Sequence, residues 1–340
     1  MKKDSALRSR TPRIQDIAQI AGVSTATVSR ALSNPDIVAK ATQRAVMEAV
    51  AKTGYRINHM ARNLRRQRSG SILALVPNLA NPFFSQILAG LSSVLSPAGY
   101  GLLIADTYTD PNPGARLTYY LDSGLADGVV IFDGTLPKSA LPTKSHVPIV
   151  MACEWTDAPL PSVRVANAEG AEIAIRHLAA MGHRKIGYLT GPPGNVLTIS
   201  RLAGMRAAMA ALGLALRDDW IFEGDFGLAC GAAAARRWMV QTDRPTAVFC
   251  ASDEMACGFM GELQHAGHSV PGDVSVVGFD NIEVSSHLTP ALTTIHQPRG
   301  LIGERAARML IGMIDTGSLT AESEVIPVDL ICRNSVAAPR

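Results

Sequence analysis

The sequence predicts a small all-α module followed by a two-lobed α/β body with parallel sheets. Apolar residues recur at helical spacing over residues 14–53, and buried strand-like runs alternate with helical stretches from residue 71 onward. The alternation occurs in two blocks, before and after residue 167, and two blocks of this kind indicate two lobes. A chain of 340 residues that is 47% hydrophobic is also long and apolar enough for more than one packed domain.

The N-terminal module has the pattern of three short helices. The first is expected over residues 14–21, and Gly22 ends it. Ser24 is a favourable N-cap for the second helix, which Asn34-Pro35 terminates. A third helix is expected over residues 41–53. Two short helices that are joined by a glycine-containing turn and supported by a third form a helix-turn-helix.

The second of these helices is expected to read DNA. Thr25, Ala26 and Arg30 face away from its apolar stripe. Arginine pairs bidentately with guanine, and small side chains contact thymine methyl groups in the major groove. The alternative for Arg30 is an ordinary surface arginine. The neighbouring hydroxyl residues are expected to contact phosphates or to cap the helix: Ser24, Thr27 and Ser29.

Charge is divided unequally along the chain. Residues 1–68 carry fourteen Lys and Arg against four Asp and Glu, a net charge of +10, whereas residues 69–340 carry −7. A basic module on an acidic body indicates an attached polyanion binder, because Lys and Arg displace counterions from phosphates. A solvated basic tail is the alternative, and the helical pattern of the segment disfavours it.

Several classes of protein are disfavoured by what the sequence lacks. It has no apolar run of 18 residues and no apolar signal region near Met1, so a cytoplasmic protein without a membrane partner is expected. Nucleophile-elbow, phosphate-loop and zinc-protease motifs are absent, which argues against an enzyme and against a cofactor or metal. An odd number of cysteines without a C-x-x-C pair indicates reduced thiols: Cys153, Cys230, Cys250, Cys257 and Cys332.

The string from Ile17 to Leu32, IAQIAGVSTATVSRAL, resembles the DNA-binding headpiece of the lactose-repressor (LacI/GalR) family. The resemblance implies a headpiece over residues 1–57 and a hinge helix over 58–69 that enters the minor groove of operator DNA. A plain basic linker is the alternative. In the hinge, Leu64 matches a side chain that wedges between base pairs, which suits an apolar group flanked by arginines. Other matching positions are the groove-facing Asn58 and Ala61 and the basic Arg65.

The rest of the chain, residues 70–340, resembles the periplasmic sugar-binding fold that this family carries behind its headpiece. The matching segments include VVGFDN at 276–281 and LTTIHQP at 292–298. Strands and helices are expected over the following ranges: strands at 72–76, 100–105, 128–132, 185–190, 247–250 and 274–277, and helices at about 82–95 and 201–212.

In that fold the ligand lies between the lobes, beyond the carboxyl ends of the strands. Asp280 is expected to accept from ligand hydroxyls, Arg201 to donate to the ligand, and Phe83 and Phe84 to pack against a ring. Asp253 has the alternative role of a helix cap. The full set that the resemblance implies is Asn81, Phe83, Phe84, Cys153, Glu154, Trp155, Arg201, Phe226, Ser252, Asp253, Asp280 and Gln297.

Two positions depart from the family pattern. Relatives often have Asp where this chain has Cys153, and Asn where it has Ser252, so the hydroxyl pattern that is recognised must differ. The segments around Phe83, Glu154 and Phe226 look most like the cytidine- and ribose-repressor branch. A nucleoside or pentose effector is therefore favoured over another sugar.

The function that follows is transcriptional repression under the control of a small molecule. The family resemblance implies a homodimer on a pseudo-palindromic operator in double-stranded DNA, associated with the nucleoid. It also implies dimerisation through sheet-edge helices that include Gln86–Val94. Effector release of DNA and corepression are both open. A sugar-binding protein without a direct DNA role is the alternative, and the headpiece disfavours it.

Overall fold

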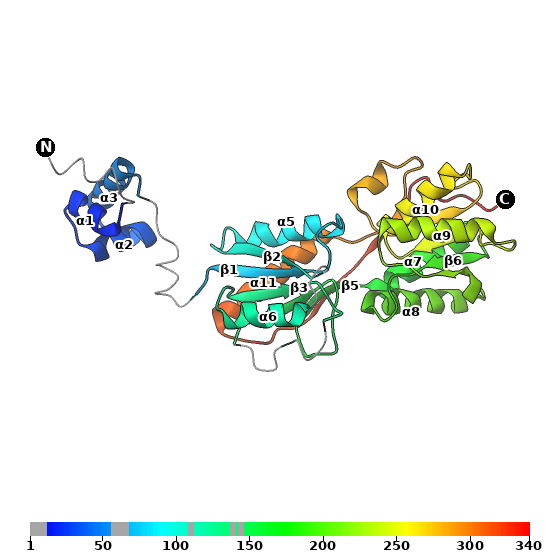
Figure 1. Ribbon diagram of the computed structural model, residues 1–340, viewed down its shortest axis with the longest axis horizontal. Coiled ribbons are helices and arrows are strands. Elements are labelled where there is room, and N and C mark those ends of the chain that lie inside the picture. Colours follow the sequence, from blue (N-terminus) through cyan, green and yellow to red (C-terminus); the bar gives the residue numbers. More distant parts are fainter. Residues whose placement is uncertain (1–11, 56–67, 108–111, 137–140, 142–145) are drawn as a thin grey trace. The chain divides into compact units, whose positions relative to one another are not determined.

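The computed structural model describes residues 12–55, 68–107, 112–136, 141 and 146–340. The chain forms two compact units, Met1–Gln67 and Arg68–Arg340 (Figure 1). The first unit is the helical headpiece and the second is the α/β body. Each is described below by itself.

The headpiece packs three helices around a small apolar core. Gly22 has φ +66, a left-handed conformation that glycine adopts without a Cβ penalty, and it turns the chain between the first two helices. The Ser24 hydroxyl caps the second helix by accepting from the Thr27 amide at 3.1 Å. The helices are α1 (Ile14–Ala21), α2 (Thr25–Ser33) and α3 (Lys40–Thr53), and the core residues are Ile17, Ala18, Val28, Ala31, Val46 and Ala49.

The body contains two six-stranded sheets in the part of the chain that the structure describes. Their strand orders correspond: β2-β1-β3-β4-β5-β11 in the first lobe and β7-β6-β8-β9-β10-β12 in the second. All pairs are parallel except β10 with β12. The strands of the first lobe are β1 (Ser71–Val76), β2 (Gly101–Asp106), β3 (Gly128–Ile131), β4 (Ile149–Ala152), β5 (Ser162–Val165) and β11 (Glu324–Ile326). Those of the second are β6 (Ile186–Leu189), β7 (Ile221–Phe222), β8 (Ala247–Cys250), β9 (Ser275–Asp280), β10 (Thr293–His296) and β12 (Asp329–Ile331).

Helices cover both faces of each sheet, which explains why the central strands are apolar throughout. In β1, Ile72 and Ala74 pack in the cluster that includes α5 (Phe83–Leu95) and α11 (Arg299–Thr316). Leu73 and Leu75 point to the other face, in the cluster that includes Leu117 of α6 (Pro113–Asp122). The helices of the second lobe are α7 (Asn167–Ala180), α8 (Val196–Ala211), α9 (Leu228–Val240) and α10 (Asp253–His265) (Figure 1).

The described chain crosses between the lobes three times: from β5 to α7, from β10 to α11 and from β11 to β12. Each crossing is short, and Gln297 lies on the second one. Because the strands that precede these crossings are parallel to their neighbours, the carboxyl ends of both sheets lie at the junction of the lobes. The fold therefore gathers the strand-end residues of both lobes there.

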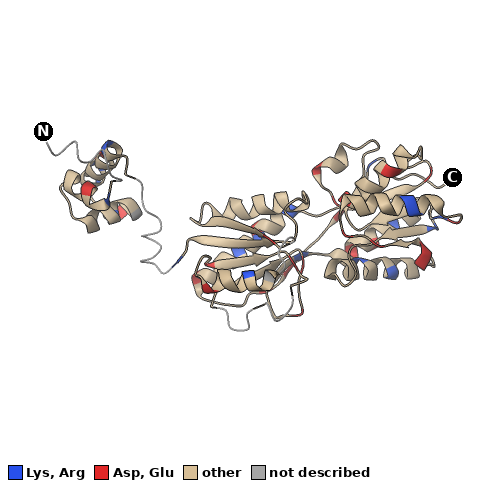
Figure 2. Cartoon of the chain, viewed as in Figure 1, with Lys and Arg blue, Asp and Glu red and all other residues tan. Residues whose placement is uncertain are grey.

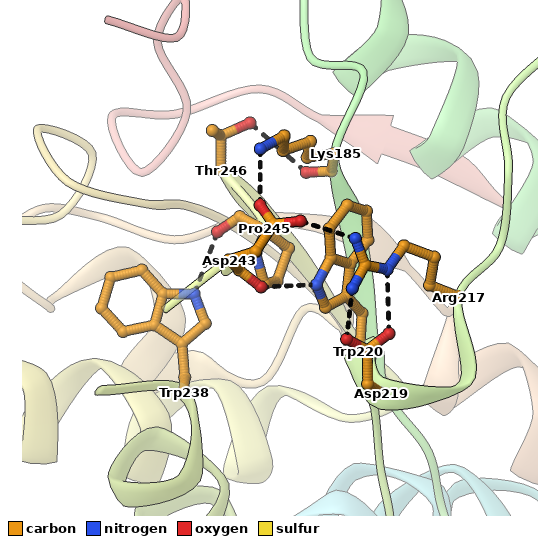
Figure 3. Close-up of polar contacts among 8 residues, drawn as sticks. All are labelled: Lys185, Arg217, Asp219, Trp220, Trp238, Asp243, Pro245 and Thr246. Carbon is orange, nitrogen blue, oxygen red and sulfur yellow. Dashed lines mark hydrogen bonds and ion pairs between the residues drawn. The ribbon is translucent and has the colours of Figure 1, made fainter. Parts of the chain in front are cut away.

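The amino ends of β6 and β8 carry a polar network instead (Figure 3). Asp243 accepts from Lys185 and from Arg217, each at 2.6 Å, and Arg217 also pairs with Asp219. The Trp220 indole donates to the Asp243 carbonyl at 2.9 Å. These ion pairs are exposed, so their contribution to stability is small. This end of the lobe is tied together by the protein's own groups.

The strands and helices expected within the described residues are present, with shifted boundaries. Most of the hinge helix expected over 58–69 lies outside those residues. The helix expected from Arg201 begins five residues earlier, at Val196, because the Asn195 side chain accepts from the amides of Leu197 and Thr198 and caps α8 there. All five cysteines have free thiols; Cys153 and Cys250 are buried, Cys230 and Cys257 are half-buried, and Cys332 is exposed.

Close contact between α5 and α11 generates a stability prediction. A Cβ at Gly90 of α5 would overlap the carbonyl oxygen of Gly300 in α11, whereas a Cβ at Gly312 would meet nothing within 4 Å. We expect Gly90→Ala to destabilise the body by about 1–3 kcal/mol, because the helices must separate. The matched Gly312→Ala should be neutral or stabilising by up to about 1 kcal/mol. Urea unfolding measures both, and equal effects of the two substitutions would contradict this packing.

Candidate functional site

A cavity of about 430 Å³ lies where the carboxyl ends of the two sheets meet. Its volume suits a ligand of small-molecule size. Loops after strands of both lobes line it, together with the first turns of α5 and α8. The lining residues are Pro77, Asn78, Asn81, Phe83, Phe84, Thr107, Phe132, Asp133, Thr135, Cys153, Glu154, Pro192, Asn195, Leu197, Arg201, Asp225, Phe226, Ser252 and Asp280.

Aromatic rings form the apolar wall on the first lobe. Phe83 and Phe84 contact edge to face at a centroid distance of 5.1 Å, and Phe84 contacts Phe132 in the same way at 5.9 Å. Asn81 fixes this wall, because its side-chain oxygen accepts from the Phe83 amide at 2.8 Å where α5 begins. Phe226, from the second lobe, has φ +67 and also faces the cavity. The cavity thus offers flat apolar surfaces from both lobes.

Glu154 joins the two lobes across the cavity. One carboxylate oxygen accepts from the Gly134 amide at 2.6 Å, and the other accepts from the Asn195 side chain, in the second lobe, at 2.8 Å. Burial raises the pKa of this carboxyl group, and the two hydrogen bonds oppose that rise. Glu154 is therefore a buried carboxylate that both lobes hold in place.

Asp133 is a second buried carboxylate on the first lobe. It follows β3 and accepts from the Thr107 hydroxyl at 2.8 Å and from the amide and hydroxyl of Thr135 at 2.9 and 2.6 Å. Neutral donors thus hold this carboxylate, with no ion pair among the described residues around it. It presents acceptor oxygens to the cavity.

Asp280 is the carboxylate of the second lobe. It ends β9 with φ +130, and it accepts from the Gln297 side chain at 2.6 Å and from the Asp253 amide at 3.4 Å. Burial raises its pKa to about 7, although Arg201 and Arg299 lower it. A carboxyl group in an unusual backbone conformation at a strand end is typical of a binding position.

Asp253 lies behind Asp280 rather than in the cavity lining. It is fully buried, and its oxygens accept from the Thr294 hydroxyl at 2.5 Å and the Ile282 amide at 2.8 Å. Burial raises its pKa to about 6. The cap of α10 is Ser252, which accepts from the Met255 amide at 3.1 Å. Asp253 thus supports the strand-end loop from inside the lobe.

Arg201 is the cationic side chain of the lining, and it is buried. Its Nε donates to the Asn167 side chain at 2.9 Å, and an Nη donates to the Ala251 carbonyl. Its guanidinium also lies 3.8 Å from the centroid of the Phe279 ring. Burial lowers the pKa of Arg201, and Asp280 opposes this. The position of its charge is fixed by the protein.

Most of the predicted effector residues meet in this cavity, and three lie outside its lining. Those three are Asp253, Gln297 and Trp155. Gln297 donates to Asp280, and the guanidinium carbon of Arg164 lies 4.7 Å from the centroid of the Trp155 ring. Sequence reasoning missed several polar lining residues: Asn78, Thr107, Asp133, Thr135, Asn195 and Asp225. Thr107 directly follows β2, and Asp133 follows β3 after one intervening residue. A polar residue at the end of an apolar strand is the same signal that identified Asp280.

The proposed DNA-reading surface is exposed on α2. Thr25, Ala26 and Arg30 are exposed, whereas Val28 on the opposite side is buried against the other helices. Arg30 Nε donates to the Ala26 carbonyl at 3.3 Å, and the Ser24 and Thr27 hydroxyls lie 2.9 Å apart at the cap. The half-buried Ser29 is one turn from Ala26 on the same helix. The expected hinge residues lie outside the described part of the chain: Asn58, Ala61, Leu64 and Arg65.

The basic excess of the N-terminal unit is concentrated at its ends. Residues 12–55 carry five Lys and Arg against three Asp and Glu, so most of the +10 belongs to residues 1–11 and 56–68. In the body, basic and acidic residues are interspersed along the chain (Figure 2). The basic segments therefore flank, in the sequence, the helix that exposes Arg30.

A helix-turn-helix unit and a body with a ligand cavity between its lobes define the class of this protein: a ligand-responsive DNA-binding regulator. Comparison with known proteins agrees with this class. A model of the "Bacterial regulatory proteins, lacI family" matches residues 13–58, and one of the "Periplasmic binding protein-like domain" matches 175–336. The chain belongs to the LacI family of transcriptional regulators, and it is not an enzyme.

Three relatives illustrate the similarity. The HTH-type transcriptional repressor CytR of Escherichia coli (strain K12) is 36% identical over 328 residues, 96% of each chain. The repressor PurR of Photobacterium profundum is 33% identical over 95% of this chain and 98% of its own. The lac repressor dimer bound to operator and the anti-inducer ONPF matches with a TM-score of 0.85 and 27% identity, over 97% of this chain and 100% of that one.

Within the described residues, no group of three or more His, Cys, Asp or Glu side chains is arranged to hold a metal ion. No described helix combines the length and the apolar character that a membrane span requires.

The raised pKa of Asp280 predicts how stability depends on pH. The folded body keeps a proton that an aspartate with the ordinary pKa of 3.8 releases, so it loses stability as the pH rises from 3.8 to about 7. Asp280→Asn removes the ionisation, and its amide oxygen can still accept from Gln297. At pH 8 we expect its Tm to exceed that of the unsubstituted protein by about 2–4 °C, with a smaller difference at pH 5 and little difference at about pH 4. A variant less stable than the parent at pH 8 would contradict this.

Proposed function

We propose that this protein represses transcription as a homodimer on a pseudo-palindromic operator, with one headpiece on each half-site. The headpiece is assigned to residues 1–57, the hinge to 58–69 and the effector-binding body to 70–340. DNA contacts are assigned to exposed and half-buried residues of α2 and its cap and to the hinge: Ser24, Thr25, Ala26, Thr27, Ser29, Arg30, Asn58, Ala61, Leu64 and Arg65. The protein is expected to act in the cytoplasm, at the nucleoid.

The effector is proposed to bind in the cavity between the lobes and to be a nucleoside, a pentose or another small sugar. The observation that carries this proposal is the cavity's composition, in which aromatic walls from both lobes surround buried acceptor groups. Aromatic faces suit a base or the apolar face of a sugar, and carboxylates suit hydroxyl and amino donors. Glu154 and Asp280 are assigned as the acceptors and Arg201 as a donor.

The dimer interface is assigned to the outer edge of the first lobe. Strand β2 is the edge strand of its sheet, and Leu103 and Ile104 on it are 38% and 45% exposed. Gln86 and Ala89 of the adjacent α5 are also exposed, in line with the expected involvement of residues 86–94. Apolar side chains on an exposed sheet edge favour a covered, protein-facing surface.

Operator reading by Arg30 is tested by its replacement. We expect Arg30→Ala to weaken operator binding by about 1–3 kcal/mol and to relax the base preference at one position of each half-site. The control is Lys52→Ala on α3, which removes the same charge and should weaken binding to all sequences alike, if at all. Fluorescence anisotropy with operator and single-base variants measures both. Loss of affinity without any change in base preference would assign Arg30 to a phosphate.

Selection from a random double-stranded DNA library tests the proposed function directly. With the full chain, the enriched sequence should be a pseudo-palindrome, and a nucleoside or sugar should change the affinity for it. Enrichment of a single asymmetric half-site would contradict the dimer on a two-fold site. An enriched palindrome whose binding no compound of either class alters would contradict the proposed effector.

A further inference from the structure

The cavity lining is acidic. Asp133, Glu154, Asp225 and Asp280 face it, against Arg201 as the one cationic side chain among the described lining residues. Asp133 and Glu154 are 6% and 8% exposed, so water screens their charges poorly. Asp280 is 5% exposed and, with a pKa of about 7, adds a partial negative charge at neutral pH. The negative charge of the lining would therefore repel an anionic ligand.

Arg201 is poorly placed to compensate for such a ligand. Two of its three guanidinium nitrogens donate to Asn167 and Ala251, and the plane of the group lies on the Phe279 ring. A phosphate ester is best bound by a free, bidentate guanidinium fork. Most of the Arg201 guanidinium already donates hydrogen bonds within the protein.

Helix N-termini are the usual alternative cradle for phosphate, and α5, α8 and α10 all begin at the cavity. Their first-turn amides, however, donate to oxygens of the chain itself. Asn81 accepts from the α5 amide of Phe83. In α8, the Asn195 side chain accepts from the amides of Leu197 and Thr198. In α10, Ser252 accepts from the Met255 amide, and Asp280 accepts from the Asp253 amide. The sites where a phosphate could bind are occupied by side chains.

The same carboxylates can bind a neutral ligand that carries hydrogen-bond donors. Each oxygen of Glu154 accepts one hydrogen bond from the protein, and a carboxylate oxygen has capacity for a second. Hydroxyl or amino groups of a ligand can fill that capacity, whereas phosphate oxygens offer only acceptors. Glu154 is also held by both lobes, so a donor bonded to it is bonded at the lobe junction.

We propose that this cavity accepts uncharged nucleosides or sugars and excludes their phosphate esters, and that Glu154 is a residue that determines this specificity. The inference rests on the proposed function, in which the cavity is the effector site. It adds the charge state of the effector and the residue that reads a donor group on it.

Calorimetry with the full chain tests the preference for uncharged ligands over phosphate esters, called the charge rule below. Cytidine, adenosine and ribose are each titrated beside the ester that carries one phosphate on its primary hydroxyl. For every parent compound that binds, the ester should bind at least about tenfold more weakly. An ester that binds as tightly as its parent, or more tightly, would overturn the charge rule while leaving the cavity as an effector site. Failure of all six compounds to bind would remove the proposed effector class and this inference with it.

Glu154→Gln tests the residue. The substitution keeps the shape and removes the charge, so we expect weaker binding of the parent compound, by at least about fivefold, and a smaller difference between parent and ester. The matched control is Asp122→Asn at the exposed end of α6, which should leave both affinities within about twofold. Thermal unfolding of both variants shows that they are folded. A folded Glu154→Gln variant with the parent-to-ester ratio of the unsubstituted protein would overturn the role of Glu154.

Discussion

The hydrogen bond between Glu154 and Asn195 is the interaction on which the cavity depends most. It connects the loop after β4 in one lobe to the cap of α8 in the other, at 2.8 Å. Three chain crossings bring the carboxyl ends of both sheets together, and this bond joins the two lobes within the cavity lining. A ligand there contacts groups from both lobes, which is how a small molecule can bias the arrangement of two lobes.

Two buried carboxyl groups, one in the cavity lining and one behind it, lower the stability of the fold. Asp253 and Asp280 are both buried, and burial raises the pKa of each. Gln297 and Thr294 satisfy some of their oxygens, and Arg299 lies near enough to lower both pKa values. Arg299 also donates to the carbonyls of Phe83 in the first lobe and Asn281 in the second, at 3.3 and 3.2 Å. The strand end that carries Asp280 is thus tied to the start of α5.

Much of the fold and part of the site could be predicted from the sequence. The headpiece was predictable because Gly22 and Ser24 are strong local signals that the structure uses as a turn and a cap. Short strands such as β7 and β12 lack the length for a pattern, and their pairing depends on tertiary contacts. Asp253 was predicted to bind the effector because it lies near a strand end. Its burial behind Asp280 depends on tertiary packing, which the spacing of residues in the sequence cannot show. Asn195 has a readable capping signal, whereas its bond to Glu154, 41 residues away, has none.

In the proposed function, occupancy of the cavity between the lobes controls DNA binding by the headpiece. The most direct measurement is the affinity of the full chain for its selected operator at increasing concentrations of a compound that binds the body. Linkage requires that operator and effector change each other's affinity by the same factor. We expect a change of at least about fivefold in operator affinity, equal to the change in effector affinity measured with operator present. An operator affinity that stays constant while the effector saturates the body would show that the cavity does not control the headpiece.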